Sequence, residues 1–98
     1  MSFQLVLRPA AKADLSESFT WYEAQRRGLG DEFLVAVERK LAQIESNPMQ
    51  FPVVRNATRR AIVLRFPFSV FYVFDGVLVS VLAVMHHARA PTRWQQRN

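Results

Sequence analysis

Two apolar segments on either side of Asp75-Gly76 constrain the fold of this chain more than any other feature. Residues 68–74 and 77–85 are almost wholly hydrophobic, and each is far shorter than the roughly 20 residues that cross a membrane as a helix. An Asp-Gly pair tolerates the positive φ angles of a two-residue type I′ turn, so the sequence predicts a β-hairpin. The pairs expected to face each other are Phe74–Val77, Tyr72–Val79, Val70–Val81 and Phe68–Ala83.

The two faces of this predicted hairpin differ in composition. One face is almost entirely apolar, and we expect it to meet the rest of the core. The other face combines Ser69 and Ser80 with apolar residues such as Phe71 and Leu82, so it is more hydrophobic than a solvated surface needs to be. Part of the second face is therefore expected to be covered, either by a partner or by the carboxyl-terminal end of the chain.

Two helices are predicted upstream of the hairpin. Apolar residues recur every three or four positions from residue 10 to 27 and again from 33 to 44, which places them on one face of each helix. Pro9 suits a first helical turn, Gly28-Leu29-Gly30 indicates a helix stop and a sharp turn, and Asn47-Pro48 ends the second helix. Because about three residues join them, the helices should run antiparallel. The two stripes are Ala11, Leu15, Phe19 and Tyr22, and then Phe33, Leu34, Val37, Leu41 and Ile44.

Short strands are predicted at both ends of this helical pair. Residues 3–7 would place Phe3, Leu5 and Leu7 on one face of a short strand, and residues 60–65 form another strand before a break at Phe66-Pro67. The predicted order is β-α-α-β-β-β. This order indicates an α+β fold, in which an antiparallel helical hairpin packs on a small, mostly antiparallel sheet. The pattern alone leaves open how the first strand joins the sheet.

The second half of the chain is strongly basic. Residues 51–98 contain seven arginines and one acid, a net charge of +6, whereas residues 1–50 contain six cations and seven acids, a net charge of −1. Every cation after residue 50 is arginine, whose planar guanidinium makes bidentate hydrogen bonds to carboxylate and phosphate. The distribution favours contact with nucleic acid or with an acidic protein, and it does not choose between them. A basic surface that merely faces water is the alternative interpretation.

A polar, ionisable cluster follows the last apolar segment. It contains His86-His87, Arg89, Arg93 and Trp94. Histidine changes its charge near neutral pH, and both histidine and arginine donate hydrogen bonds to anions. Successive residues of a strand point to opposite faces, so at most one of the two histidines can join any given site.

Several kinds of site lack the residues that they require. The chain has no cysteine, so neither disulfides nor thiolate metal sites are available, and no His, Asp and Glu residues show metal-ligand spacing. We therefore expect no metal and no cofactor. The amino terminus lacks the pattern of a secretion signal. The expectation is a single cytoplasmic domain spanning residues 1–98, with no membrane contact.

Several short motifs, taken together in order, carry a family resemblance that covers nearly the whole chain. They are Trp21-Tyr22-Glu23-Ala24-Gln25, Gly28-Leu29-Gly30 with Phe33, Asn47-Pro48, Phe51-Pro52, Arg59-Arg60, Arg65-Phe66-Pro67-Phe68, and His86-x-x-Arg89 with Pro91 and Trp94. This series resembles the RelE/ParE family of bacterial toxins of type II toxin–antitoxin systems. The resemblance implies a first strand that lies parallel to a neighbour. It also implies a small, ParD-like antitoxin as the partner that neutralises the toxin.

The two branches of that family differ in their targets. ParE-like members inhibit DNA gyrase, whereas RelE-like members enter the ribosome and cleave mRNA. The Trp21-Tyr22 motif, Arg65-Phe66-Pro67-Phe68 and the ending His86-x-x-Arg89 with Trp94 are more similar to the ParE-like branch. The resemblance therefore implies a growth-inhibiting gyrase inhibitor that requires no catalytic residues, rather than an enzyme.

A ribosome-dependent mRNA endonuclease is the alternative. Cleavage at a ribose 2′-OH needs a base, an acid and cations, and His86, Arg65 and Arg89 are the candidates. RelE-like nucleases generally carry further lysines or a tyrosine near the carboxyl end, but no lysine follows Lys40 and no tyrosine follows Tyr72 in this chain. A degenerate member that binds an antitoxin without being toxic is a third hypothesis.

The ParE-like interpretation predicts which residues make contacts. Arginine and tryptophan are the residue types that most often anchor interfaces. The residues expected to contact the target or an anion are Arg59, Arg60, Arg65, His86, Arg89, Arg93 and Trp94. Trp21 and Tyr22 are expected to lie under the antitoxin, although Trp21 could instead pack on the first strand. Ala90 stands where many relatives carry an acid, which argues against an Arg–carboxylate pair there.

Overall fold

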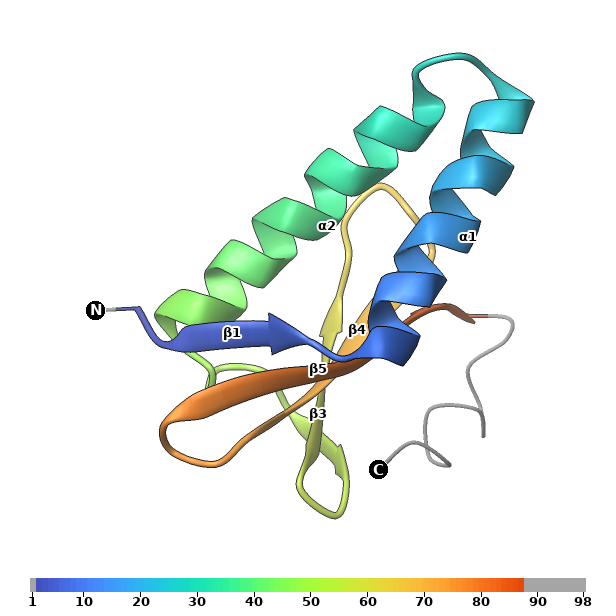
Figure 1. The fold of residues 1–98 in the computed structure, drawn as a ribbon. Helices are drawn as coiled ribbons and strands as arrows, with labels where there is room; N and C mark the ends of the chain where they lie inside the picture. The colour runs from blue at the N-terminus through green and yellow to red at the C-terminus, as the bar shows by residue number, and fades with distance from the viewer. Residues whose placement is uncertain (1, 88–98) are drawn as a thin grey trace.

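The computed structural model describes residues 2–87 and has the predicted α+β architecture, shown in Figure 1. The order strand, helix, helix, strands is confirmed, and one short strand, β2 (Val53–Arg55), is an addition that the sequence did not predict. The sequence of β2, Val-Val-Arg, does not alternate between apolar and polar residues, and all three residues are exposed. The elements of the fold are β1 (Gln4–Leu7), α1 (Pro9–Gln25), α2 (Leu29–Ser46), β2 (Val53–Arg55), β3 (Thr58–Ile62), β4 (Phe68–Phe74) and β5 (Leu78–His86).

The five strands form one sheet in the order β1-β5-β4-β3-β2. The first strand, β1, lies parallel to β5, with Leu5 opposite Val79, as the family resemblance implied. All other neighbouring strands run antiparallel. The two helices lie side by side, and α1 crosses the sheet beside β1 and β5 (Figure 1). The fold is therefore a mixed sheet whose helical hairpin follows directly from its edge strand β1.

The register of the β4–β5 hairpin differs from the prediction. Phe74 pairs with Val79 and Tyr72 pairs with Val81, so residues 72–74 meet partners two positions further along β5 than expected. A shift of two residues preserves which side chains share a face. The helix-facing side of this part of the hairpin is therefore the predicted one, although its pairs are not.

The turn of the hairpin explains the shift. Oδ1 of Asp75 accepts hydrogen bonds from the N–H groups of Leu78 (2.7 Å) and Val77 (2.9 Å), and these bonds hold the pKa of Asp75 below its ordinary value. Asp75 does not have the positive φ that a type I′ turn would require, whereas Gly76 has a φ of 98°. The N–H of Asp75 donates to the carbonyl of Leu78, so the turn centres on Gly76 and Val77.

A β-bulge changes the register again near the middle of β5. Tyr72 pairs with Val81 but Phe71 pairs with Ala83, so Leu82 is an extra residue on β5. An extra residue reverses the alternation of the side chains beyond it. Ala83, which was predicted to share the helix-facing side, consequently lies with Phe71 in a second buried cluster. Val84 takes its place in the main core.

Strand β3 begins and ends earlier than predicted. The sequence indicated a strand over residues 60–65, but β3 covers Thr58–Ile62 and residues 64–67 form bends. Arg65 has a positive φ of 75°, which is incompatible with an extended strand. The second half of the predicted strand is therefore the connection that leads into β4.

The helical hairpin is closed by a single carboxylate. Both oxygens of Glu23 accept a hydrogen bond from the N–H of Gly28, at 3.0 and 3.1 Å, and Oε1 also accepts one from the N–H of Gly30 at 2.8 Å. Gly28 has the left-handed φ of 89° that the turn requires, but Leu29 and Gly30 already belong to α2. Glu23 thus satisfies amide groups that the start of a helix leaves without partners.

An aromatic cluster joins the helical hairpin to the sheet. The ring of Tyr22 lies 5.2 Å from that of Phe33, 5.1 Å from that of Phe66 and 6.0 Å from that of Phe68. Edge-to-face and tilted geometries of this kind are favourable for aromatic pairs. The predicted stripes of both helices therefore meet the predicted helix-facing side of the sheet in one core.

Candidate functional site

Arg59, one of the predicted contact residues, is bound to the protein's own backbone. Its Nη1 donates to the carbonyl of Phe51 over 2.6 Å and to that of Met49 over 3.1 Å. These bonds attach the segment after α2 to strand β3. A guanidinium with two carbonyl partners is held in place, so Arg59 braces this segment in the isolated chain.

Tyr72 secures the same segment from inside the core. Its hydroxyl donates to the carbonyl of Pro48 over 2.6 Å, and its side chain is fully buried. Burial raises the pKa of Tyr72 to about 12, while the nearby charge of Arg59 acts in the opposite direction. Tyr72 is therefore a core residue that donates a hydrogen bond, as expected for an aromatic residue in a buried strand.

Three polar residues form a chain of hydrogen bonds on the sheet side away from the main core. Nε of Arg60 donates to Oγ of Ser69 over 2.8 Å, and this Oγ lies 3.0 Å from Nε2 of His87. Ser69 is fully buried, whereas Arg60 and His87 are partly exposed. Among residues 2–87, Arg60 forms no ion pair with a carboxylate. A guanidinium and an imidazole fixed on one hydroxyl can together bind an anion.

His86 lies apart from this hydrogen-bond chain. It is opposite Phe68 in the hairpin, and its ring packs edge-on against that of Phe68 at 5.3 Å. Phe68 belongs to the main core, whereas Ser69, the partner of His87, lies on the other side. The two histidines thus have different environments, as the alternation of strand residues predicts.

Arg65 takes part in an ion-pair network at the end of the helical hairpin. Its Nη2 lies 3.1 Å from Oε1 of Glu32, and Nη2 of Arg26 lies 3.0 Å from Oε2 of the same carboxylate. Hydrogen bonds from Arg26 and then Arg65 hold the pKa of Glu32 below its ordinary value. Glu32 thereby links the helix–helix turn to the connection between β3 and β4.

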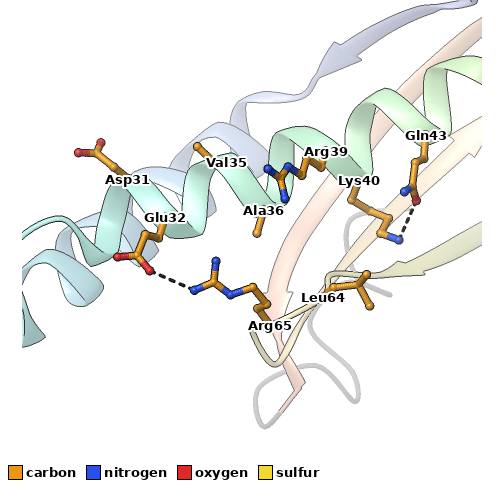
Figure 2. A pocket seen from close by; sticks show the side chains of 9 residues that line it. All are labelled: Asp31, Glu32, Val35, Ala36, Arg39, Lys40, Gln43, Leu64 and Arg65. Carbon is orange, nitrogen blue, oxygen red and sulfur yellow. Dashed lines mark hydrogen bonds and ion pairs between the residues drawn. The ribbon is translucent and has the colours of Figure 1, made fainter.

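Beside this network lies a pocket of about 320 Å³ between α2 and the connection from β3 to β4. Figure 2 shows Glu32 and Arg65 at one side of the pocket and Lys40 bonded to Gln43 at the other. Nζ of Lys40 also lies 5.2 Å from the centre of the Phe51 ring. The pocket therefore combines apolar walls with several charges. Its lining residues are Asp31, Glu32, Val35, Ala36, Arg39, Lys40, Gln43, Leu64 and Arg65.

The two residues predicted to contact an antitoxin have opposite exposures. Trp21 is 57% exposed, and its ring stands edge-on to that of Tyr22 at 5.1 Å. Tyr22 is buried in the aromatic cluster, where burial raises its pKa. The structure thus leaves the Trp21 ring available at the surface and assigns Tyr22 to the core.

Several residues that define these sites were not predicted from the sequence. Ser69 connects Arg60 to His87, and Lys40 and Leu64 line the pocket. A lone serine inside the otherwise apolar residues 68–74 was a signal for the first of these. Three predicted contact residues, Arg89, Arg93 and Trp94, lie outside the described residues.

Among residues 2–87, no group of three or more His, Cys, Asp or Glu side chains is arranged to hold a metal ion. Neither α1 nor α2 is long and apolar enough to cross a membrane.

The fold of this chain is shared with proteins of known structure. The chain superposes on a structure of the chromosomal ParDE toxin–antitoxin system from P. aeruginosa with a TM-score of 0.77 and 17% identity, covering 87% of this chain and 96% of that one. It also superposes on the RelBE2 toxin–antitoxin complex from Mycobacterium tuberculosis with a TM-score of 0.63 and 19% identity, covering 89% and 100%. At these identities the likeness shows a shared RelE/ParE-like fold.

The family itself is shown by sequence. The sequence model of the family described as the ParE toxin of the type II toxin–antitoxin system, parDE, matches residues 5–91, which is most of the chain. This protein therefore belongs to the ParE toxin family. No curated protein matches its sequence significantly.

Proposed function

We propose that this protein is the toxin of a type II toxin–antitoxin pair, that a cognate ParD-like antitoxin neutralises it, and that its target is DNA gyrase. The match to the ParE toxin model across residues 5–91 carries this proposal. Exposed Trp21 and partly exposed Arg60 support it, because tryptophan and arginine are the commonest anchors of protein interfaces. Neither residue needs to catalyse a reaction in this role.

Two assays on the purified protein test the proposed target. The expected result is loss of gyrase supercoiling, or trapped cleavage of plasmid DNA, together with intact mRNA on programmed ribosomes. Arg60→Ala should weaken gyrase inhibition, whereas Arg27→Ala, which removes an exposed arginine at the helix–helix turn, should not. Normal supercoiling and normal growth during strong expression of folded protein would contradict toxicity and favour a degenerate member that only binds an antitoxin.

A second candidate, cleavage of mRNA, is favoured by the hydrogen-bond chain of Arg60, Ser69 and His87. Arg60 would stabilise charge on a phosphate and His87 would transfer a proton. This assignment replaces His86 with His87, because His86 packs against Phe68. If mRNA is cut while gyrase is unaffected, His87→Ala and Arg60→Ala should both abolish cutting.

A further inference from the structure

Strand β5 has two different neighbours along the edge that faces away from β4. The first part of this edge, from Leu78 to Val81, pairs with β1, and the N–H of Arg8 donates to the carbonyl of Val81 over 3.0 Å just before α1 begins. Further along, the N–H of Val84 donates to Oδ2 of Asp14 on α1 over 2.9 Å. Figure 1 shows α1 beside β5 at this point. A carboxylate of the helix therefore takes over where β1 ends.

The bulge at Leu82 makes this hydrogen bond possible. Alternate residues of a regular strand direct their backbone groups to opposite sides. The carbonyl of Val81 is directed to Arg8, so without a bulge the N–H of Val84 would be directed toward β4. The extra residue Leu82 reverses this order. The bond between Val84 and Asp14 can therefore form only in the bulged register.

The side chains in this part of β5 do not select the register by themselves. Residues 81–85 are all apolar, and each is at most 5% exposed. In a strand without the bulge, Ala83 and Met85 would face the helices, and Leu82 and Val84 would face the other side. Both arrangements bury apolar side chains, and a strand without apolar–polar alternation has a weakly specified register. One specific polar contact from outside the β4–β5 pair can therefore decide between them.

The register determines which histidine reaches Arg60 and Ser69. In the bulged register, the N–H of His87 donates to the carbonyl of Pro67 over 2.8 Å, and Nε2 of His87 lies 3.0 Å from Oγ of Ser69. Without the bulge, His86 would occupy this side of the strand and His87 would turn toward the helices. A bulge that redirects a side chain in this way is common next to functional sites.

We propose that Asp14 is a positioning residue, which holds β5 in its bulged register. It thereby places His87, rather than His86, beside Arg60 in the polar group that also contains Ser69. Asp14 lies across β5 from this group and acts on it only through the backbone of the strand. The inference rests on the proposed function in taking Arg60 as a contact residue, and it adds the residue that sets the geometry around that contact.

NMR spectroscopy of the full chain tests the link between Asp14 and His87. In the unaltered protein, a nuclear Overhauser contact should join the His87 ring to Ser69, and a scalar coupling across the hydrogen bond should join the Val84 nitrogen to Cγ of Asp14. In Asp14→Ala the contact of His87 with Ser69 should be lost, and the Val84 amide should exchange about tenfold or more faster. Absence of the scalar coupling would overturn the inference even if Asp14→Ala does not fold.

Two matched variants separate the hydrogen bond from the charge of Asp14. Asp14→Asn keeps an oxygen that can accept from Val84 but removes the charge, so it should retain the contact between His87 and Ser69. Glu17→Ala removes an exposed acid from the same helix and should also retain it. Persistence of the contact in folded Asp14→Ala would overturn the inference. Loss of the contact in Asp14→Asn would overturn it as well, because charge rather than the hydrogen bond would then be responsible.

The gyrase assay relates this geometry to the proposed function. Asp14→Ala should inhibit supercoiling about tenfold less than the unaltered protein, whereas Asp14→Asn and Glu17→Ala should inhibit it normally. Equal inhibition by folded Asp14→Ala that has lost the His87 contact would overturn the functional part of the inference. If the unaltered protein does not inhibit gyrase while the NMR results are as expected, the proposed target is wrong and the positioning role of Asp14 stands.

Discussion

Arg65 has a backbone conformation that arginine rarely adopts. Its φ of 75° costs about 1–2 kcal/mol for a residue with a Cβ atom. Its guanidinium forms an exposed ion pair with Glu32, and such pairs contribute only about 0–1 kcal/mol. The position is therefore occupied by arginine at some cost to the stability of the fold, as is common where a residue serves binding.

Replacement of Arg65 by glycine and by alanine separates the backbone cost from the ion pair. Both changes remove the guanidinium, but only glycine relieves the positive φ. We expect Arg65→Gly to have a free energy of unfolding about 1 kcal/mol higher than that of Arg65→Ala. Urea denaturation monitored by circular dichroism measures the difference. Equal stabilities would mean that the positive φ is not maintained in solution.

Tyr72 gives a prediction about pH as well as mutation. Its pKa of about 12 in the folded protein lies above the ordinary value near 10 in the unfolded chain. The folded state therefore keeps this proton after the unfolded state has lost it, so the stabilisation is present below pH 10 and decreases as the pH rises from 10 toward 12. Urea denaturation at several alkaline pH values should show this decline in the unaltered protein and a smaller one in Tyr72→Phe.

The same variant reports on the hydrogen bond to Pro48. Tyr72→Phe leaves the buried carbonyl of Pro48 without its 2.6 Å donor, which should lower the free energy of unfolding by about 1–3 kcal/mol. Ultraviolet absorbance of tyrosinate provides the control. In the folded protein, Tyr72 should remain largely protonated at pH 11, and the absorbance change that reports its ionisation at higher pH should be absent from the variant.

At the scale of elements, the contact between the two helices depends on Gly30. A Cβ atom at this position would lie 2.7 Å from Cδ1 of Phe19 and 2.9 Å from the Phe19 carbonyl oxygen. The second contact is with backbone, which cannot rotate away. The start of α2 can therefore approach α1 this closely only because residue 30 has no side chain.

Gly30→Ala should lower the free energy of unfolding by about 1–3 kcal/mol through overpacking, despite the better helix propensity of alanine. Gly30→Ala should cost less stability in a Phe19→Ala background, because alanine at position 19 removes the ring atoms nearest to residue 30. Thermal unfolding of the two single variants and the double variant measures this coupling. Additive effects would show that the ring does not limit the approach of the helices.

At the scale of the whole molecule, the aromatic cluster connects both helices to the sheet. Tyr22 contacts Phe33 of α2 as well as Phe66 and Phe68 near the start of β4. Trp21, the adjacent residue, is 57% exposed. Of these two neighbouring aromatic residues, Tyr22 belongs to the core and Trp21 to the surface. Variants of each can therefore separate a role in stability from a role in binding.

Tyr22→Ala should lower the free energy of unfolding by about 3–5 kcal/mol, whereas Trp21→Ala should change it by about 0.5 kcal/mol or less. The affinity for the antitoxin, corrected for the folded fraction of each variant, should show the reverse order. Trp21→Ala should bind the antitoxin more weakly than the unaltered protein does. Denaturation and calorimetric titration measure the two quantities. A large loss of stability in Trp21→Ala would show that its ring packs within the fold.

The sequence by itself determined the elements of this protein and their order, apart from the short strand β2. The spacing of Ala11, Leu15, Phe19 and Tyr22 identified α1, and the glycines at 28 and 30 identified the connection to α2. These signals are local, because the periods of helices and strands and the tolerance of glycine for positive φ are properties of short segments. The motif series likewise identified the family that the sequence match shows.

Only the tertiary structure decided the register of the hairpin and the composition of the sites. The Asp75 hydrogen bonds and the extra residue Leu82 moved each β4 residue to a new partner on β5. The structure shows that Arg59 binds the carbonyl of Phe51. It also brings together Arg60, Ser69 and His87, which lie in three separate segments of the chain. Periodicity specifies which face a side chain occupies, but contacts between distant segments depend on turns, bulges and unpaired edges that it does not encode.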